Sequence, residues 1–355
     1  MMRTPFIRRG ALAAGLIVTG AIALTACSSE ADTAANANAA GESAGHGSIT
    51  VQQSWIKNEE FAGEFYATSK GYYEEAGFDE VTLLEGPSTG VAELMGGTVQ
   101  VALNDPLAVA AAVANEGATI KIIGATFQKN PFTILSLKDG ADIATVADLK
   151  GKKIGVQDSN RAAFSAFLEA NGLVEGTDVE VVAVQYDPAP LVNGEVDGFY
   201  AYLTNESLTV ELGGNPVTNL PLADNGFPLV AETVSVTDAY LAENRELLKD
   251  FLVAEIKGWS DVLADPTQAA SDVVADFGTD LDPVKTEAAM KAQALLIATP
   301  DTEANGLFSI TEDMQQGTVD SLAGAGIEVD ASQIFDLSLL EEVYAENPEL
   351  VDYAG

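Results

Sequence analysis

The chain has 355 residues, of which 17 are Lys or Arg and 54 are Asp or Glu, so its formal net charge is −37 at pH 7. Such an acidic surface repels phosphate and anionic lipid headgroups, which excludes nucleic acid as a partner and excludes electrostatic attachment to a membrane. The length and a hydrophobic content of 47% suffice for two modest domains or one large one.

The N-terminal residues have the three parts of a secretory signal. Arg3, Arg8 and Arg9 precede an apolar stretch over 10–24, and small residues follow it. The stretch has about fifteen residues, whereas a transmembrane helix needs about twenty. We therefore expect residues 1–26 to be a signal peptide.

Cys27, the only cysteine, stands directly after this stretch. Leu24-Thr25-Ala26-Cys27 resembles the bacterial lipobox, which implies that 1–26 is a lipoprotein signal peptide and that Cys27 carries lipid. The alternatives are an uncleaved anchor or a buried cysteine. Residues 27–47 contain no large apolar side chain, which predicts a flexible tether. The expected location is extracytoplasmic, with the membrane contacted through the lipid only.

Predicted strands and helices alternate from residue 48 to residue 127. Phe61, Phe65 and Tyr72 have helical spacing, and Ser88 is a candidate N-cap. The predicted strands are 48–54, 81–84, 99–103 and 120–127, and the predicted helices are 61–76, 88–96 and 107–115. This order favours a mostly parallel sheet flanked by helices.

The alternation restarts after Asn130-Pro131. Strands are predicted at 132–137, 154–157, 179–184 and 198–202, helices at 159–170, 238–263, 283–297, 310–323 and 337–345, and an extended stretch at 227–236. We expect an α/β fold of two lobes, with extended hinge crossings near 128–133 and 226–236. Lobe I is expected to comprise 48–130 plus 232–355, and lobe II 131–231. A ligand would lie between them, at the carboxyl ends of the strands.

Several segments together resemble one family, which includes sulfonate-binding proteins and THI5-like thiamine-pyrimidine proteins. The matching segments are Ser54-Trp55-Ile56-Lys57-Asn58, Gly63, the run 70–77, the run 148–156, the run 193–198, Tyr202 and Asn205-Glu206. The resemblance implies a type II periplasmic-binding-protein fold. It also implies a substrate-binding lipoprotein, expected to be monomeric, that delivers a small solute to an ABC permease and its ATPase.

Candidate ligand-binding residues lie where predicted strands of the first lobe end. Trp55 follows the first strand, and its indole would stack on a flat heterocycle; the family has an aromatic residue here, and a core position is the alternative. Asn58 is either a hydrogen-bonding residue or a turn residue. Asn104 and Asp105 would face the cleft, although helix capping explains Asp105 equally well.

Further candidates lie at the first crossing and beyond it. Gln128 closes a strand and would reach the cleft from the hinge. Asn160 lies at the start of a helix, where free N–H groups attract negative charge. The adjacent Arg161 would grip an anion, or it would form a surface ion pair, which is the commoner outcome.

Aromatic residues and carboxylates recur together after two strands of the second lobe. Tyr186 and Asp187 follow one strand, and Tyr202, Asn205 and Glu206 follow another. Carboxylates accept N–H groups of an aminopyrimidine or an isoalloxazine, but they repel nitrate and sulfonates. This pattern favours a thiamine-pyrimidine precursor or riboflavin over sulfonate, taurine or nitrate. We expect the ligand to bridge Trp55 and a tyrosine of the other lobe in a closed form.

An enzyme of the THI5 type is the competing class. The chemistry of those relatives depends on histidine and a cysteine-rich segment, whereas here His46 falls in the tether and the single cysteine carries lipid. Cys/His catalysis and His/Cys metal sites are therefore not expected. The Glu59-Glu60 pair is interpreted as a solvated face, and there is no phosphate-binding loop. The sequence predicts no catalytic residue, no metal and no cofactor.

Overall fold

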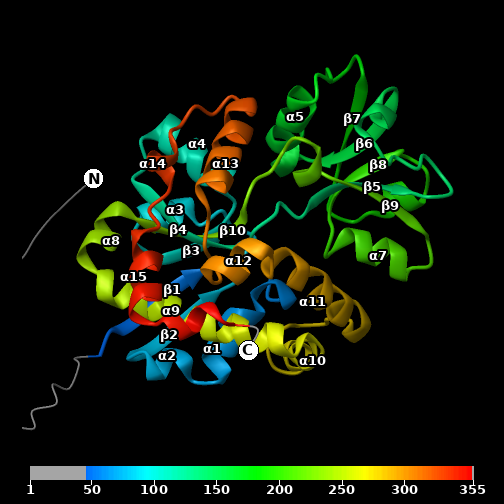
Figure 1. The fold of residues 1–355 in the computed structure, drawn as a ribbon. Coiled ribbons are helices and arrows are strands. Elements are labelled where there is room, and N and C mark those ends of the chain that lie inside the picture. Colours follow the sequence, from blue (N-terminus) through cyan, green and yellow to red (C-terminus); the bar gives the residue numbers. More distant parts are fainter. Residues whose placement is uncertain (1–44, 354–355) are drawn as a thin grey trace, which may run out of the picture. The chain divides into compact units, whose positions relative to one another are not determined.

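The computed structural model describes residues 45–353, which belong to one compact unit, Ser43–Gly355. The predicted signal peptide, Cys27 and residues 27–44 of the predicted tether lie outside the described residues. In the described range no helix is both long and apolar enough to span a bilayer. The fold is α/β with two lobes, each built on a five-stranded mixed sheet (Figure 1).

Sheet I has the strand order β2-β1-β3-β10-β4, and four of its strands point the same way. Strand β10 is antiparallel to both neighbours, because the chain enters it from the edge where the other strands end. The strands are β1 (Gly47–Gln52), β2 (Phe78–Leu84), β3 (Val101–Asn104), β4 (Ile120–Phe127) and β10 (Ala231–Thr237). The predicted, mostly parallel sheet is confirmed, with one reversed strand in its interior.

Sheet II repeats this arrangement in the order β7-β6-β8-β5-β9. The reversed strand is β5, which the chain enters directly after β4 of sheet I. The strands are β5 (Phe132–Leu137), β6 (Lys152–Gln157), β7 (Val179–Val184), β8 (Gly198–Tyr202) and β9 (Val217–Pro221). Strand β9 was not predicted, because its short sequence VTNLP buries only Leu220 and shows no clear apolar alternation.

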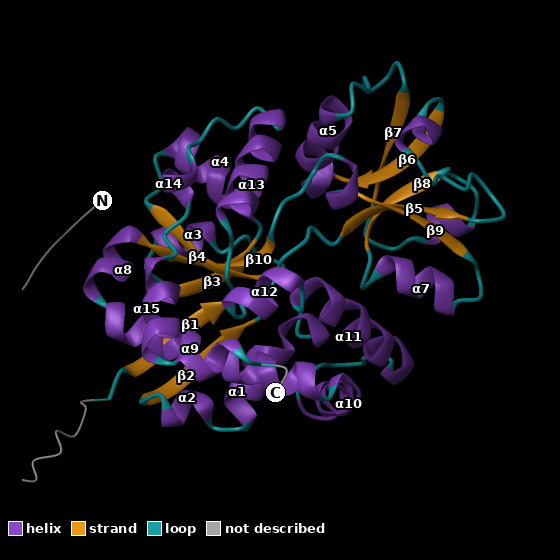
Figure 2. Cartoon of the chain, in the orientation of Figure 1, coloured by secondary structure: helices purple, strands orange, loops and turns teal. Residues whose placement is uncertain are grey.

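Helices cover both faces of sheet I (Figure 2). Val101 and Leu103 pack into one hydrophobic cluster and Ala102 into another, as alternation along a strand requires. One face carries α1 (Ala62–Ser69), α2 (Tyr72–Glu75), α9 (Arg245–Ala264) and α15 (Ser338–Glu346); the other carries α3 (Val91–Met95), α4 (Pro106–Glu116), α13 (Glu312–Gly324) and α14 (Ala331–Ile334).

The remaining helices flank sheet II or extend the C-terminal part of the chain. Those packed on sheet II are α5 (Arg161–Ala170), α6 (Ala189–Val192) and α7 (Glu206–Leu212). The others are α8 (Asp238–Glu243), α10 (Pro266–Asp276), α11 (Pro283–Ile297) and α12 (Pro300–Asn305). Helix α11 contacts both α7 and the short 3-10 helix η1 (Glu59–Phe61), so it lies next to residues of both lobes.

Three predicted helices differ from the structure. The helix expected over 61–76 is divided into η1, α1 and α2, because Gly71 adopts a left-handed φ of 78°. The helix expected over 238–263 is interrupted at Asn244. The helix expected over 88–96 begins at Val91 after Gly90, and the Ser88 hydroxyl accepts only the Gly90 N–H at 3.0 Å.

His46 was expected in the tether but belongs to the folded part. Its Nε2 lies 2.6 Å from Oδ2 of Asp250, and its backbone N–H donates to the Gly77 carbonyl at 2.8 Å. Its ring also contacts Phe78, with centroids 5.1 Å apart. These contacts join His46 to residues that are distant in the sequence. They hold the chain in place one residue before β1.

Helices α1 and α9 approach closely through two glycines. A Cβ on Gly258 would lie 2.2 Å from the Gly63 carbonyl oxygen, and a Cβ on Gly63 would lie 2.1 Å from the Trp259 ring. Trp259 is fully buried in this contact. The two backbones therefore meet where no side chain fits, and this sets the position of α1 under sheet I.

Gly258→Ala is expected to lower the free energy of unfolding by about 1–3 kcal/mol, because its methyl group overlaps backbone atoms of α1. Urea denaturation of the folded unit measures this loss. Gly324→Ala is the matched control, since a Cβ there meets nothing within 4 Å. Equal stability of the two variants would contradict the close approach of the helices.

Each of these two helices carries a buried carboxyl group, Glu64 on α1 and Glu255 on α9. Glu64 and Glu255 are each 1% exposed, and within the described part of the chain one oxygen of each has no hydrogen-bond partner. The Tyr73 hydroxyl donates to the other oxygen of Glu255. Burial raises the pKa of Glu255 to about 8, and burial together with the nearby Glu255 raises that of Glu64 well above its usual value.

The free energy of unfolding is expected to fall between about pH 5 and pH 8. In this range Glu64 and Glu255 retain their protons in the folded chain, whereas in the unfolded chain they release them above a pKa near 4.5. For each such acid, the free energy of unfolding changes by up to about 1.4 kcal/mol per pH unit. Glu255→Gln should flatten this slope in urea titrations at several pH values, whereas Glu74→Gln on the exposed face of α2 should not. An unchanged slope in Glu255→Gln would show that Glu255 is ionised in the fold.

Candidate functional site

A cavity of about 490 Å³ lies where the ends of the two sheets meet. The strands β1, β3, β6, β7 and β8 end there, and the reversed strands β5 and β10 begin there. Sheet I and its loops contribute Ser54, Trp55, Asn58, Glu59, Glu60, Pro87, Ser88, Thr89, Asp105, Ala231 and Glu232. Sheet II and its loops contribute Phe132, Gln157, Ser159, Asn160, Tyr186, Tyr200, Tyr202, Thr204, Asn205 and Glu206.

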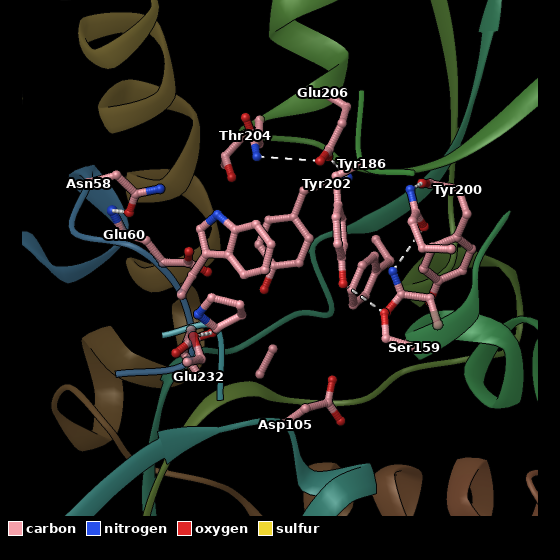
Figure 3. Close-up of a pocket in the computed structure, with 18 of the residues that line it drawn as sticks. Asn58, Glu60, Asp105, Ser159, Tyr186, Tyr200, Tyr202, Thr204, Glu206 and Glu232 are labelled. Carbon is pink, nitrogen blue, oxygen red and sulfur yellow. Dashed lines mark hydrogen bonds between the residues drawn. The ribbon is translucent and has the colours of Figure 1, made fainter. Parts of the chain in front are cut away.

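Aromatic rings from both lobes meet inside the cavity. The Trp55 and Tyr186 rings have centroids 5.0 Å apart at an interplanar angle of 61°, an edge-to-face contact. The Tyr186 hydroxyl and the Ser159 hydroxyl are 2.9 Å apart, which fixes the tyrosine on its own lobe (Figure 3). Trp55 and Tyr186 therefore form a contact across the cavity that a flat ligand would replace or extend.

A second aromatic group belongs to sheet II alone. The Phe132 ring lies 4.7 Å from that of Tyr200 and 4.7 Å from that of Tyr202, the latter at 88°. The Tyr200 hydroxyl is buried and has no hydrogen-bond partner among the described residues. This group combines an apolar wall with a hydroxyl that is available to a ligand.

Acidic side chains line the side of the cavity formed by sheet I. Figure 3 shows Glu60 and Glu232 on one side of the cavity, opposite Tyr186 and Tyr200. Burial raises the pKa of Glu232 to about 7, and burial followed by the charge of Glu232 raises that of Glu60 well above its usual value. Burial also raises the pKa of Asp105 to about 6, opposed by the Leu107 N–H that Asp105 accepts at 2.7 Å.

The acid from sheet II is held by its own loop. Oε2 of Glu206 accepts the Tyr202 backbone N–H at 2.8 Å, and Oε1 accepts the Asn205 side-chain amide at 3.4 Å. Burial raises the Glu206 pKa, opposed by the backbone N–H groups of Tyr202 and of Glu206 itself and by the charge of Lys285. Both oxygens therefore already have donors, and Glu206 holds the turn after β8 in place.

In the described range, neither Lys nor Arg lines this cavity. Arg161 pairs with Glu175, with both side chains partly exposed. Lys285, at the edge, donates to Oδ1 of Asn205. The cavity thus offers many acceptors and no lining cation to an incoming ligand.

Eight of the eleven predicted binding residues line the cavity: Trp55, Asn58, Asp105, Asn160, Tyr186, Tyr202, Asn205 and Glu206. Asn58 and Asp105 each make a local hydrogen bond within the chain and also line the cavity. Asn58 Oδ1 accepts the Glu60 N–H at 3.1 Å and Asp105 caps α4, while each also faces the cavity.

Asn104, Gln128 and Asp187 do not line the cavity. Asn104 is 0% exposed, and its Oδ1 accepts the hydroxyls of Thr233 and Ser235 at 2.8 and 2.9 Å. Gln128 is buried and donates to the Ala125 carbonyl at 3.0 Å. Asp187 is exposed and accepts the Ala189 N–H at 2.9 Å. Each forms hydrogen bonds within the chain that sequence could not reveal.

The sequence analysis missed Glu60, Glu232, Phe132 and Tyr200. Interpreting Glu59-Glu60 as a solvated face was wrong, because Glu59 is buried and Glu60 lines the cavity. The available signal was the position of this pair directly after the first strand and its turn. No comparable sequence signal marked Phe132 and Glu232. Both stand at the starts of strands whose antiparallel direction is established only by the tertiary fold.

A family model described as NMT1/THI5 like matches residues 58–269, which is more than half of the chain. The chain belongs to the NMT1/THI5-like family. The match begins at Asn58 beside the cavity and includes all of sheet II.

Three relatives of this NMT1/THI5-like chain have described activities. The riboflavin-binding protein RibY of Chloroflexus aurantiacus is 29% identical over 266 residues, covering 69% of this chain and 72% of that protein. A 4-amino-5-hydroxymethyl-2-methylpyrimidine phosphate synthase of Schizosaccharomyces pombe is 27% identical, covering 66% and 71%. The formylaminopyrimidine-binding protein of Halalkalibacterium halodurans is 23% identical, covering 62% and 68%.

Among solved structures, the periplasmic aliphatic sulphonate-binding protein SsuA of Escherichia coli is similar to this NMT1/THI5-like chain, with a TM-score of 0.62 at 16% identity. The match covers 83% of this chain and 99% of that one. The predicted periplasmic-binding-protein fold is confirmed.

Asn104→Ala is expected to lower the free energy of unfolding by about 1–3 kcal/mol, because the buried Ser235 hydroxyl loses its acceptor and the Thr233 hydroxyl keeps only the backbone carbonyl of residue 104. Urea denaturation without ligand measures this loss. Asp187→Ala, at an exposed position, should stay within about 0.5 kcal/mol of the unchanged chain. An Asn104→Ala variant of unchanged stability would show that these bonds contribute nothing.

Proposed function

We propose that this chain is the extracytoplasmic solute-binding protein of an ABC importer, and that its cavity binds a small, flat nitrogen heterocycle. The ligand class is a thiamine-pyrimidine precursor or a riboflavin-like molecule. One observation carries the proposal: aromatic rings of both lobes and several buried acids surround a single cavity without a lining Lys or Arg in the described range.

The aromatic rings suit the faces of such a ligand. Trp55 and Tyr186 approach from different lobes, so a heterocycle between or beside them contacts both and stabilises their approach. The cavity volume of about 490 Å³ is within the usual range for small-molecule sites. Binding would thus be coupled to the relative position of the lobes, which is the signal that a permease needs.

The acids suit the edges of the ligand. Carboxylates accept N–H groups, whereas the charge of a sulfonate or nitrate placed among Glu60, Glu232 and Asp105 would find no Lys or Arg in the described lining to offset it. The similarity to SsuA, at 16% identity, supports the fold and does not indicate which ligand this chain binds. RibY and the formylaminopyrimidine-binding protein, whose names record heterocyclic ligands, agree with the acidic lining.

The synthase relatives support an enzyme as the second candidate. His46, the only histidine, contacts Asp250 and does not line the cavity. The acid–base groups in the cavity are carboxyls and tyrosines, which bind and orient a ligand without supplying a nucleophilic thiol or an imidazole. We therefore propose binding without chemical conversion.

The N-terminal part of the proposal rests on sequence. Residues 1–26 would be removed as a lipoprotein signal peptide, Cys27 would carry the lipid, and the following segment would tether the folded unit to the membrane. The acidic surface gives the unit no electrostatic attraction to anionic lipids. The lobes, 48–130 plus 232–355 and 131–231, would close about the two crossings on the ligand.

The test is isothermal titration of the folded unit, Ser43–Gly355, with riboflavin, 4-amino-5-hydroxymethyl-2-methylpyrimidine, taurine, an alkanesulfonate and nitrate. We expect a heterocycle to bind and the anions not to bind. Binding of an anion alone would overturn the proposed ligand class, and release of a chemically altered heterocycle, detected by mass spectrometry, would favour the enzyme.

Trp55→Ala is expected to weaken heterocycle binding by about tenfold or more, because base–aromatic stacking contributes on the order of 1–3 kcal/mol. Its melting temperature without ligand should change little, since Trp55 is only half-buried. Tyr72→Ala, an aromatic residue of α2 outside the cavity, is the control and should retain affinity. A large loss of stability with unchanged affinity would make Trp55 a core residue.

A further inference from the structure

We propose that Glu232 is the specificity-determining residue of this cavity and that its Oε2 accepts a hydrogen bond from an N–H group of the ligand. The inference rests on the proposed function and adds the chemical feature that the ligand must carry. It concerns a residue at the start of β10, on the second crossing between the lobes.

Only one of the two carboxyl oxygens of Glu232 has a hydrogen-bond donor among the described residues. Its side chain is 6% exposed and lines the cavity, and Oε1 accepts the Ser54 hydroxyl at 2.8 Å. Oε2 is buried and has no partner among the described residues. A buried acceptor without a donor costs about 1–3 kcal/mol, so a donor from a ligand would recover this free energy.

The other lining acids do not share this feature. Both oxygens of Glu206 accept hydrogen bonds from its own loop, and Asp105 Oδ1 caps α4. Among the acids that line the cavity in the described range, only Glu232 has a fully buried oxygen without a donor. The two Glu232 oxygens are therefore distinct: Ser54 donates to one, and the other has no donor among the described residues.

The backbone at Glu232 is strained. Its φ is +46°, in the left-handed region that costs a residue with a Cβ about 1–2 kcal/mol. Three other residues with a side chain have positive φ in the described range, Asp142, Asp280 and Phe308, and none of them lines the cavity. The conformation places the Glu232 side chain at the entry to sheet I, next to Ser54.

The charge state of Glu232 depends on several facing groups. Ser54 and Glu60 face it from the segment after β1, Asp105 from the start of α4, and Tyr202 from β8. Burial, followed by the charge of Glu232, raises the pKa of Glu60 well above its usual value.

An aminopyrimidine edge and the imide edge of a flavin both carry an N–H next to an acceptor atom. The N–H of either edge would donate to Oε2 of Glu232, whereas a ligand without an N–H leaves Oε2 unpaired. Since acceptance of the N–H needs ionised Glu232, whose pKa burial raises to about 7, affinity should fall as pH drops below 7. Because binding is linked to the loss of one proton from Glu232, the affinity should fall by up to about tenfold for each pH unit.

The test is isothermal titration with matched probes, on the folded unit that binds a heterocycle. One pair is riboflavin and 3-methylriboflavin; the other is 4-amino-5-hydroxymethyl-2-methylpyrimidine and its 4-dimethylamino analogue. The unchanged chain should bind the N–H member of a pair at least about tenfold more tightly. Glu232→Gln should weaken the N–H member by about tenfold or more and the methylated member by less than about threefold.

Glu255→Gln is the matched control. Glu255 is also a buried acid whose Oε2 has no partner among the described residues, but it lies on α9 and does not line the cavity. Its variant should keep the discrimination between probes and the pH dependence of Kd, both of which Glu232→Gln should lose. If Glu232→Gln does not fold, Ser54→Ala replaces it and should weaken the N–H member by about threefold to tenfold.

The outcomes separate the two proposals. Unchanged discrimination in Glu232→Gln, or in Ser54→Ala where that variant is used, would overturn the role of Glu232 and leave the proposed function standing. Failure of the unchanged chain to bind any heterocycle would overturn the proposed function and this inference with it. Loss of discrimination in Glu255→Gln as well would assign the effect to the stability of lobe I and also overturn the inference.

Discussion

The two crossings between the sheets bring residues at the starts of β5 and β10 to the edge where the other strands end. Because β5 and β10 enter their sheets from the edge where the other strands end, Phe132 and Glu232 join residues at the ends of β1, β3, β6 and β8. A purely parallel sheet would present only strand ends and helix N-termini to a ligand. Here the crossings add an aromatic ring from one lobe and a carboxylate from the other.

Burial of carboxyl groups is a recurring feature of this acidic chain. Glu64 lies on α1 and Glu255 on α9, and Glu60, Asp105 and Glu232 line the cavity. With few cations in the sequence to pair with them, these groups adjust their protonation instead, because burial penalises the charged form. Burial thus raises the pKa both of acids in the core of lobe I and of acids that line the cavity.

Much of the fold follows from local sequence patterns. Apolar runs such as 120–127 and 132–137 identified strands correctly, since a buried strand needs a short continuous apolar segment. The divided helices depended on local conformation at Gly71 and Asn244, which periodicity does not register. The missed strand β9 acquires its place from pairing with β5, a contact between residues more than seventy positions apart.

The sequence alone determined the alternating α/β order, the acidic balance, and the strand-end positions of Trp55, Tyr186 and Tyr202. It did so because periodicity, charge and the residues after a strand are local properties. The tertiary structure decided that Asn104, Gln128 and Asp187 serve the chain itself, and that Glu60 and Glu232 face the cavity. Which hydrogen-bonding groups remain unpaired depends on neighbours that only folding brings together.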